Sequence, residues 1–341
     1  MAMDVLWKSP WGLTARGTGF ASGGGNTEAA WMDQYGGGWQ EIFPNGGDEC
    51  AYKNAPLNFH GEASIQAWDY TVQKHASSCF AVEHTVALRR SPFRIHRTVI
   101  VERNLAGLQN SRVDCQQSEE NLHYLWGHHP ALGDPFLSGD CVLRVPARTF
   151  VSHSLEISAS TQIPAGVRGP WPLVEGEDDR PVDLSRIPLS SDHVAEFGYI
   201  CDLEDSGYGI TSSKHSFRLW LGLATRGFPL FVVLAGTARQ PWISLVRALP
   251  HDGRRAFQQH SRYGSDQCHR RRDCAPVRAG AKVEANLAAV FYEAEQGDLR
   301  SSAPAALRSS KVPMLPPANI WSLRIRWPKM RGRRMARLRP L

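Results

Sequence analysis

The sequence predicts an all-β protein built as a large antiparallel β-sandwich. Apolar and polar residues alternate over residues 80–89 and again over 93–102, and a period of two is typical of half-buried strands. The segment around Pro92 separates the two runs and indicates a hairpin connection. Residues 282–292 repeat the alternation near the C-terminus. Strands in series, with few amphipathic helical windows, predict the sandwich.

Three stretches rich in glycine or proline are expected to be loops. They cover residues 17–26, 36–48 and 163–188. The Gly-Thr-Gly element at residues 17–19 follows no convincing strand and opens no helix. We therefore do not expect a dinucleotide site there.

Composition indicates a soluble globular protein with no membrane segment. The 341 residues suffice for one large β domain or two ordinary ones, and 42% hydrophobic and 21% charged residues are normal values. Residues 1–10 lack the apolar core of a signal peptide, and the apolar stretch at 227–236 is too short to span a bilayer.

Cysteine usage favours a cytoplasmic location. The seven cysteines are scattered and never form C-x-x-C, so we expect reduced thiols rather than a disulfide framework. Cys268, His269 and Cys274 would make at most half of a zinc site, and no second pair lies nearby. No metal is expected.

The net charge of +6 comes from one end of the chain. From Arg300 onward the sequence has eleven Lys/Arg and no Asp/Glu, which leaves −5 for the residues before it. The sequence shows no recognisable nucleic-acid recognition helix and no strands with exposed aromatic residues for base stacking. We therefore do not expect nucleic acid as a partner. Residues 298–341 are interpreted as an unstructured basic tail, and residues 1–297 as the sandwich domain.

Two segments combine histidine with glycine and aromatic residues in polar, turn-rich surroundings. The first reads GGWQEIFPNGGDE and then NAPLNFHGEASIQAWDY, and the second reads WGHHPALGDPFL. Sugar sites pair aromatic surfaces with several hydrogen-bonding side chains, because a pyranose has apolar C–H faces and a rim of hydroxyls. These segments supply Trp39, Asn45, His60, Trp68, Trp126, His128 and His129.

Both segments resemble the galactose mutarotase-like superfamily, and most of all its bacterial aldose 1-epimerases. There, a GGWQELFPNGGD loop precedes an FHGE…PW turn, and a WGHHPAFG segment follows. The resemblance covers about residues 5–211, with a shorter match at 276–294. It implies a large β-sandwich and the cofactor-free interconversion of the α and β anomers of an aldose.

The resemblance also implies residue roles. Ring opening needs a base for the anomeric hydroxyl and an acid for the ring oxygen, and histidine suits the acid because its pKa lies near neutrality. His129 aligns with the acid and His60 with a substrate-binding histidine. Asn45, Trp39, Trp126 and His128 are further candidates for substrate binding. The tryptophans could equally be core residues, and His128 should face away from His129 in an extended segment.

The region 218–277 departs from the family pattern. Relatives carry an aromatic-rich strand, a GYPWY turn and then the glutamate that acts as base. This region instead has ten arginines, three aspartates and no glutamate. One hypothesis is a frameshift between two compensating base changes, since a shifted frame of residues 227–236 can encode AFPYLWFWQE. It would leave sheet edges exposed, remove the base and impair activity.

Three functions follow as alternatives. The first is aldose 1-epimerase-like chemistry on a monosaccharide, impaired in this chain. The second is a non-catalytic carbohydrate-binding protein of the same fold. The third is a hexose-phosphate 1-epimerase, which would need a basic cluster at the cleft. The start of the chain is also shorter than in relatives.

Overall fold

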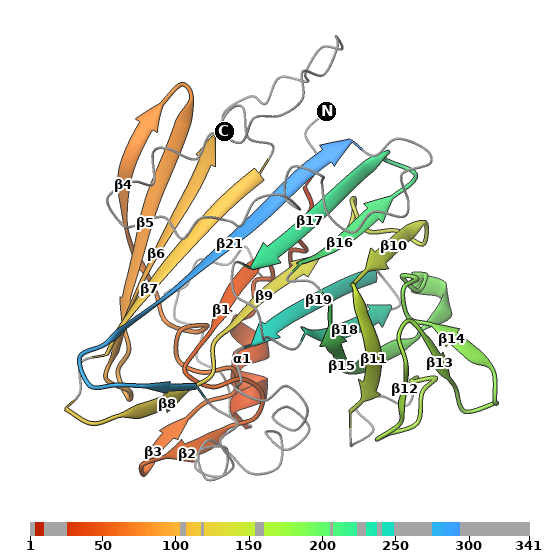
Figure 1. The fold of residues 1–341 in the computed structure, drawn as a ribbon, viewed down its shortest axis with the longest axis horizontal. Coiled ribbons are helices and arrows are strands. Elements are labelled where there is room, and N and C mark those ends of the chain that lie inside the picture. Colours follow the sequence, from red (N-terminus) through yellow and green to blue (C-terminus); the bar gives the residue numbers. More distant parts are fainter. Residues whose placement is uncertain are drawn as a thin grey trace.

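The structure is a computed structural model. Antiparallel strands make up most of its regular elements (Figure 1). The structure describes residues 4–9, 26–102, 107–116, 119–153, 160–204, 207–223, 230–236, 241–248 and 275–293. The predicted all-β antiparallel sandwich is confirmed. The basic tail at 298–341 and the Cys268–His269–Cys274 group lie outside the described residues.

Two sheets form the sandwich, and all of their strand pairs are antiparallel. The seven-stranded sheet has the order β1 (Trp39–Ile42), β9 (Gly127–Leu132), β19 (Pro241–Ala248), β18 (Leu230–Gly236), β15 (Ala195–Leu203), β11 (Ala147–Ser152) and β12 (Arg168–Pro170). The eight-stranded sheet has the order β10 (Cys141–Arg144), β16 (Gly207–Ser212), β17 (Phe217–Leu223), β21 (Lys282–Glu293), β7 (Gly107–Gln116), β6 (Phe93–Glu102), β5 (Cys79–Ala87) and β4 (Asp69–Ala76).

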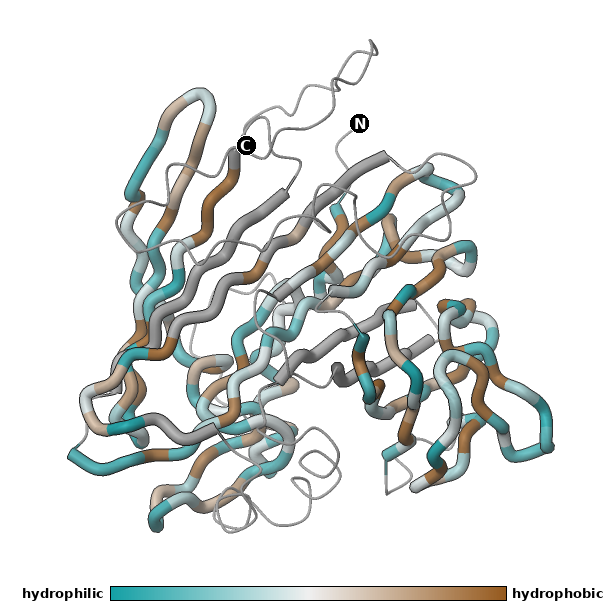
Figure 2. The backbone as a smooth tube through the Cα atoms, viewed as in Figure 1, coloured by the Kyte–Doolittle hydropathy of each residue, from teal (hydrophilic) through white to brown (hydrophobic). Residues whose placement is uncertain are grey.

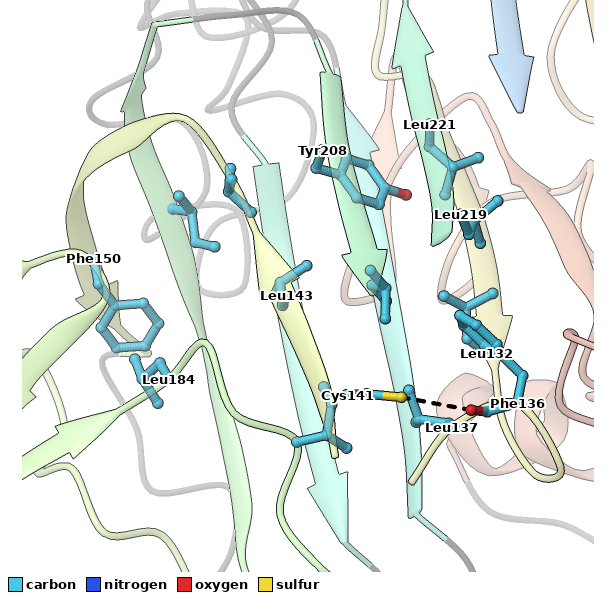
Figure 3. Packing of buried hydrophobic residues seen from close by; sticks show 14 of the residues in the cluster. Leu132, Phe136, Leu137, Cys141, Leu143, Phe150, Leu184, Tyr208, Leu219 and Leu221 are labelled. Atoms are coloured by element: carbon cyan, nitrogen blue, oxygen red, sulfur yellow. Dashed lines mark hydrogen bonds between the residues drawn. The ribbon is translucent and has the colours of Figure 1, made fainter. Parts of the chain in front are cut away.

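The main core lies between the two sheets. Leu132 and Ile200 from the seven-stranded sheet pack in one cluster with Leu143 and Leu219 from the eight-stranded sheet (Figure 3). In the same cluster the Cys141 thiol lies 3.5 Å from the carbonyl oxygen of Phe136. We call the face of the seven-stranded sheet that carries Leu132 and Ile200 its inner face, and the opposite one its outer face.

The alternating runs are strands, as predicted. β5 and β6 pair antiparallel, and the turn between them is closed by Leu88 N–H, which donates to the carbonyl of Phe93 at 2.9 Å. β21 lies between β17 and β7. Figure 2 shows hydrophilic and hydrophobic stretches along the outer hairpin formed by β4 and β5.

Two of the expected loops contain regular structure. Trp39–Ile42, within the glycine-rich 36–48, is strand β1, because it pairs with β9 along its whole length. The 163–188 stretch holds β12 and the small hairpin β13 (Leu173–Glu175) and β14 (Pro181–Asp183). Two further short pairs join β2 (Cys50–Tyr52) to β3 (Ala55–Leu57) and β8 (Leu122–Tyr124) to β20 (Ala275–Val277).

The region 218–277 contributes central strands rather than an exposed edge. β18 pairs with β15 and β19 pairs with β9, so the seven-stranded sheet is continuous and its edges are β1 and β12. This corrects the expectation of exposed sheet edges. β18 reads LFVVLAG, and its β-branched and aromatic residues favour a strand in the given reading frame. Residues 224–229, 237–240 and 249–274 lie outside the described part.

Helices contribute little. The α-helix α1 (Thr27–Gln34) and a short 3₁₀ helix η1 (Ser190–Asp192) are present in the described residues. Neither has the length or apolar character that would let it cross a membrane.

Candidate functional site

The two motif histidines meet on the outer face of the seven-stranded sheet. Successive side chains of a strand point to opposite faces, so His129 and Ala131 of β9 face outward while Leu132 faces the core. Ala131 packs there against Trp31 and Tyr35 at the end of α1. In Figure 1, α1 lies beside β1 and β9.

His60 is held by the backbone of the glycine-rich segment. Its backbone has φ of 57°, in the left-handed region that non-glycine residues rarely adopt. Its N–H donates to the carbonyl of Gly47 at 2.9 Å, and the Gly47 N–H donates to His60 Nδ1 at 3.1 Å. Because Nδ1 accepts, the neutral ring carries its proton on Nε2. The ring is thus oriented as a hydrogen-bond donor through Nε2.

His129 is a buried, neutral imidazole. Only 5% of the residue is exposed, and burial lowers the pKa of His129 to about 4. The Tyr35 hydroxyl lies 3.3 Å from Nδ1 of His129, and burial raises the pKa of that hydroxyl. When the Tyr35 hydroxyl donates to Nδ1, His129 carries its proton on Nε2, as His60 does.

Trp31 connects the two histidines. Its ring makes edge contacts with His60 at 4.8 Å and with His129 at 5.8 Å between centroids, and it stacks on Tyr35 at 4.4 Å. The His60 and His129 centroids are 5.6 Å apart. Trp31 Nε1 is buried with no hydrogen-bond acceptor among the described residues. The group therefore combines a buried aromatic cluster with two imidazoles.

Three predicted site residues lie on the inner face instead. His128 Nδ1 is 3.6 Å from a carboxylate oxygen of Glu41, and the Trp126 indole N–H donates to the other oxygen at 2.9 Å. The Trp39 ring packs edge-on against His128, with centroids 6.2 Å apart. His128 thus faces away from His129, as the extended strand predicts, and Trp126 is buried. These three residues and the pair His60–His129 are on opposite sides of the sheet.

Asn45 orders the loop that holds His60. Its amide Nδ2 donates to the carbonyls of Asn58 at 3.0 Å and Asp48 at 3.3 Å, and only 1% of the residue is exposed. These bonds tie the GGWQEIFPNGGD segment to the FHG turn. In the structure Asn45 therefore supports His60 through the backbone.

Asp48 supplies a carboxylate next to this loop. Burial first, and then the charge of Glu49, raise the pKa of the Asp48 carboxyl. The pKa of Tyr199 is raised by burial and, secondarily, by the charge of Asp48. Tyr199 packs with Ile42 in a cluster on the outer face.

Sequence reasoning missed Trp31 and Tyr35. The helix TEAAWMDQ has no clear apolar stripe, and it lies between two segments, 17–26 and 36–48, that were predicted to be loops. One signal was available: Asn26 precedes Thr27, and its side chain accepts from the Ala29 N–H at 2.9 Å as an N-cap. Among the described residues, no group of three or more His, Cys, Asp or Glu is arranged to hold a metal ion.

Comparison with known proteins identifies the fold. No protein-family model matches the chain, and no curated protein matches it. Among solved structures, a candidate aldose 1-epimerase from Escherichia coli K12 is 12% identical with a TM-score of 0.53, over 78% of this chain and 86% of that one. A candidate mutarotase from Salmonella typhimurium is 9% identical with a TM-score of 0.53, over 85% and 80% of the two chains.

A third solved structure agrees with these two. It is a galactose mutarotase-like protein from Clostridium acetobutylicum, 12% identical with a TM-score of 0.52, over 78% of this chain and 81% of that one. The chain therefore has the galactose mutarotase-like fold.

Proposed function

We propose that the protein binds a free aldose beside His60 and His129 and interconverts its α and β anomers. The observation that carries the proposal is the pair of imidazoles, with centroids 5.6 Å apart, brought together from two distant motifs on the outer face of a mutarotase-like sandwich. Fold alone does not specify an activity, so the proposal rests on the chemistry of this pair.

The proposed acid is His129 and the proposed sugar ligand is His60. With the proton on Nε2, His60 donates to a sugar hydroxyl while Gly47 N–H holds its other nitrogen. His129 delivers a proton to the ring oxygen as the ring opens, and Tyr35 fixes its orientation. Trp31 packs edge-on against both imidazoles and supports their positions.

The proposed base is Asp48. A carboxylate with a raised pKa is a better proton acceptor than one in water, and burial raises the pKa of Asp48. Asp48 follows Gly47, so the same loop positions this carboxylate and the His60 ring. This assignment gives the chain a base without the glutamate that region 218–277 lacks.

A non-catalytic carbohydrate-binding protein is the second candidate. The low pKa of His129 favours it, because a neutral imidazole is a weaker acid than an imidazolium. A cytoplasmic location belongs to the same proposal, and it is supported by Cys79 and Cys141, which are free thiols among the described residues.

Titration calorimetry against glucose, galactose and glucose 6-phosphate tests the proposal, with folding verified by circular dichroism. We expect saturable heat with a free aldose, and weaker binding of Trp31→Ala. Preference for the phosphorylated sugar would instead favour a hexose-phosphate epimerase. Absence of heat with every sugar would contradict both the enzyme and the binding protein.

A further inference from the structure

A pocket is lined in part by Asn45, from the loop that holds His60. Its volume is about 250 Å³, and it is enclosed by the β2–β3 hairpin, the β5–β6 turn and β8. Residues that line it include Asn45, Lys53, Arg90, Phe93, His123 and Tyr124. Pockets for drug-sized ligands occupy roughly 300–1,000 Å³, so this one suits a smaller molecule.

The inner wall of the pocket is aromatic and firmly packed. Phe93 and Tyr124 are buried, and both contact Phe43, with ring centroids 4.9 Å and 5.4 Å away. Leu57 belongs to the same cluster and also lines the pocket. This wall would hold the ring or alkyl body of a ligand without rearrangement.

The rim of the pocket carries excess positive charge. Lys53 is paired with the Glu120 carboxylate, and these two charges offset each other. Arg90 Nη1 donates to the Pro56 carbonyl at 2.9 Å and to Asn58 Oδ1 at 2.7 Å, both neutral acceptors. Within the described part of the chain, no carboxylate oxygen lies within 4.0 Å of the Arg90 guanidinium. Its planar array of donors matches an oxyanion.

Asn45 also lines the pocket, and because only 1% of the residue is exposed, it contributes to the wall. The pocket therefore offers a cation and an aromatic wall.

We propose that this pocket binds a small organic oxyanion, a carboxylate or a phosphate monoester. Its charged group pairs with Arg90, and its body packs on Phe93 and Tyr124. Such a ligand would lie behind the loop that positions His60, since Asn45 and Gly47 belong to one turn. This site is separate from the proposed sugar site.

Direct binding to the full chain tests the proposal without reference to activity. The probes are 4-hydroxybenzoate and glycerol phosphate, titrated by calorimetry. We expect saturable binding of at least one, with affinity lowered about tenfold or more in Arg90→Gln and partly retained in Arg90→Lys. The substitutions leave intact the bond from the Arg90 backbone N–H to Glu62.

Arg89→Gln is the matched control. Arg89 is the exposed neighbour of Arg90, donates to the same Glu62 carboxylate through its backbone, and does not line the pocket. The Arg89→Gln variant should bind the probe with the same affinity as the unmodified chain. Failure of both probes to bind the folded protein would overturn the proposal, and so would an equal loss in Arg89→Gln and Arg90→Gln. A failure of aldose binding would leave these titrations unaffected.

Discussion

The imidazole rings of His60 and His129 lie 5.6 Å apart between centroids, inclined at 59°. Burial lowers the pKa of His60 well below its ordinary value, and the charge of a protonated His129 lowers it further. The folded protein therefore disfavours a proton on either ring. Protonation of the pair is therefore coupled to the stability of the fold.

Acidification should destabilise the protein. The ordinary histidine pKa is 6.5, and that of His129 is lowered to about 4 in the folded chain. The unfolded chain therefore binds protons that the folded chain excludes. The contribution of neutral His129 to the free energy of unfolding is fully present above pH 6.5 and is lost as the pH falls through about 4. Asp48, with its raised pKa, acts in the opposite direction.

Urea unfolding from neutral pH to about pH 4 measures this loss. His129→Gln should flatten the dependence of the free energy of unfolding on pH. His75→Gln, on the exposed strand β4, should keep the original slope. Identical slopes for the His129→Gln variant and the unmodified chain would show that His129 is not the group responsible.

Gly61→Ala should be more destabilising than Gly47→Ala. Both glycines have positive φ, 74° and 79°. A Cβ at Gly61 would lie 2.3 Å from the Phe43 carbonyl oxygen, whereas one at Gly47 would meet nothing within 4 Å. Positive φ alone costs roughly 1 kcal/mol, and the clash adds to it. Chemical denaturation of the two variants compares them, and equal losses would mean that the clash is relieved by movement of the turn.

Glu62→Gln should lower stability by about 2–4 kcal/mol. One Glu62 oxygen accepts from the backbone N–H groups of Arg89 and Arg90 at 2.9 Å and 2.8 Å, and the other accepts from Ser91 N–H and Oγ. Glutamine replaces one acceptor with a donor, which leaves buried N–H or O–H groups unpaired. Glu83→Gln, at a half-exposed site, is the control for urea denaturation. A loss no larger than in that control would show that these four hydrogen bonds to Glu62 do not stabilise the fold.

Local patterns in the sequence predicted much of the fold. The period of two located β5, β6 and β21. In β5 the buried face changes along the strand, since Cys79 and Ala81 are buried at one end and Val86 at the other, while Phe80 is exposed. β18 and β19 were not predicted, since their place between β15 and β9 depends on distant partners rather than on periodicity. The dependence of β18 and β19 on distant partners also explains why the exposed sheet edges expected for region 218–277 are not found at these two strands.

The candidate site was predictable only in part. The motifs identified His60 and His129, and strand geometry separated His128 from His129. Trp31 and Tyr35 were missed because α1 is short and lacks an apolar stripe. Trp39 and Trp126 share a motif with the histidines, but the pleat of β1 and the turn before β9 direct them to the inner face.

The most direct test of the proposed activity is polarimetry. The rate at which freshly dissolved α-glucose or α-galactose changes its optical rotation should increase with protein concentration. His129→Ala should slow the catalysed rate by about 10²-fold or more, the usual scale for losing a positioned acid. His128→Ala, on the inner face of the same strand, should keep the rate within a few-fold. A folded protein that binds aldose without accelerating mutarotation, or equal losses in both variants, would contradict the account.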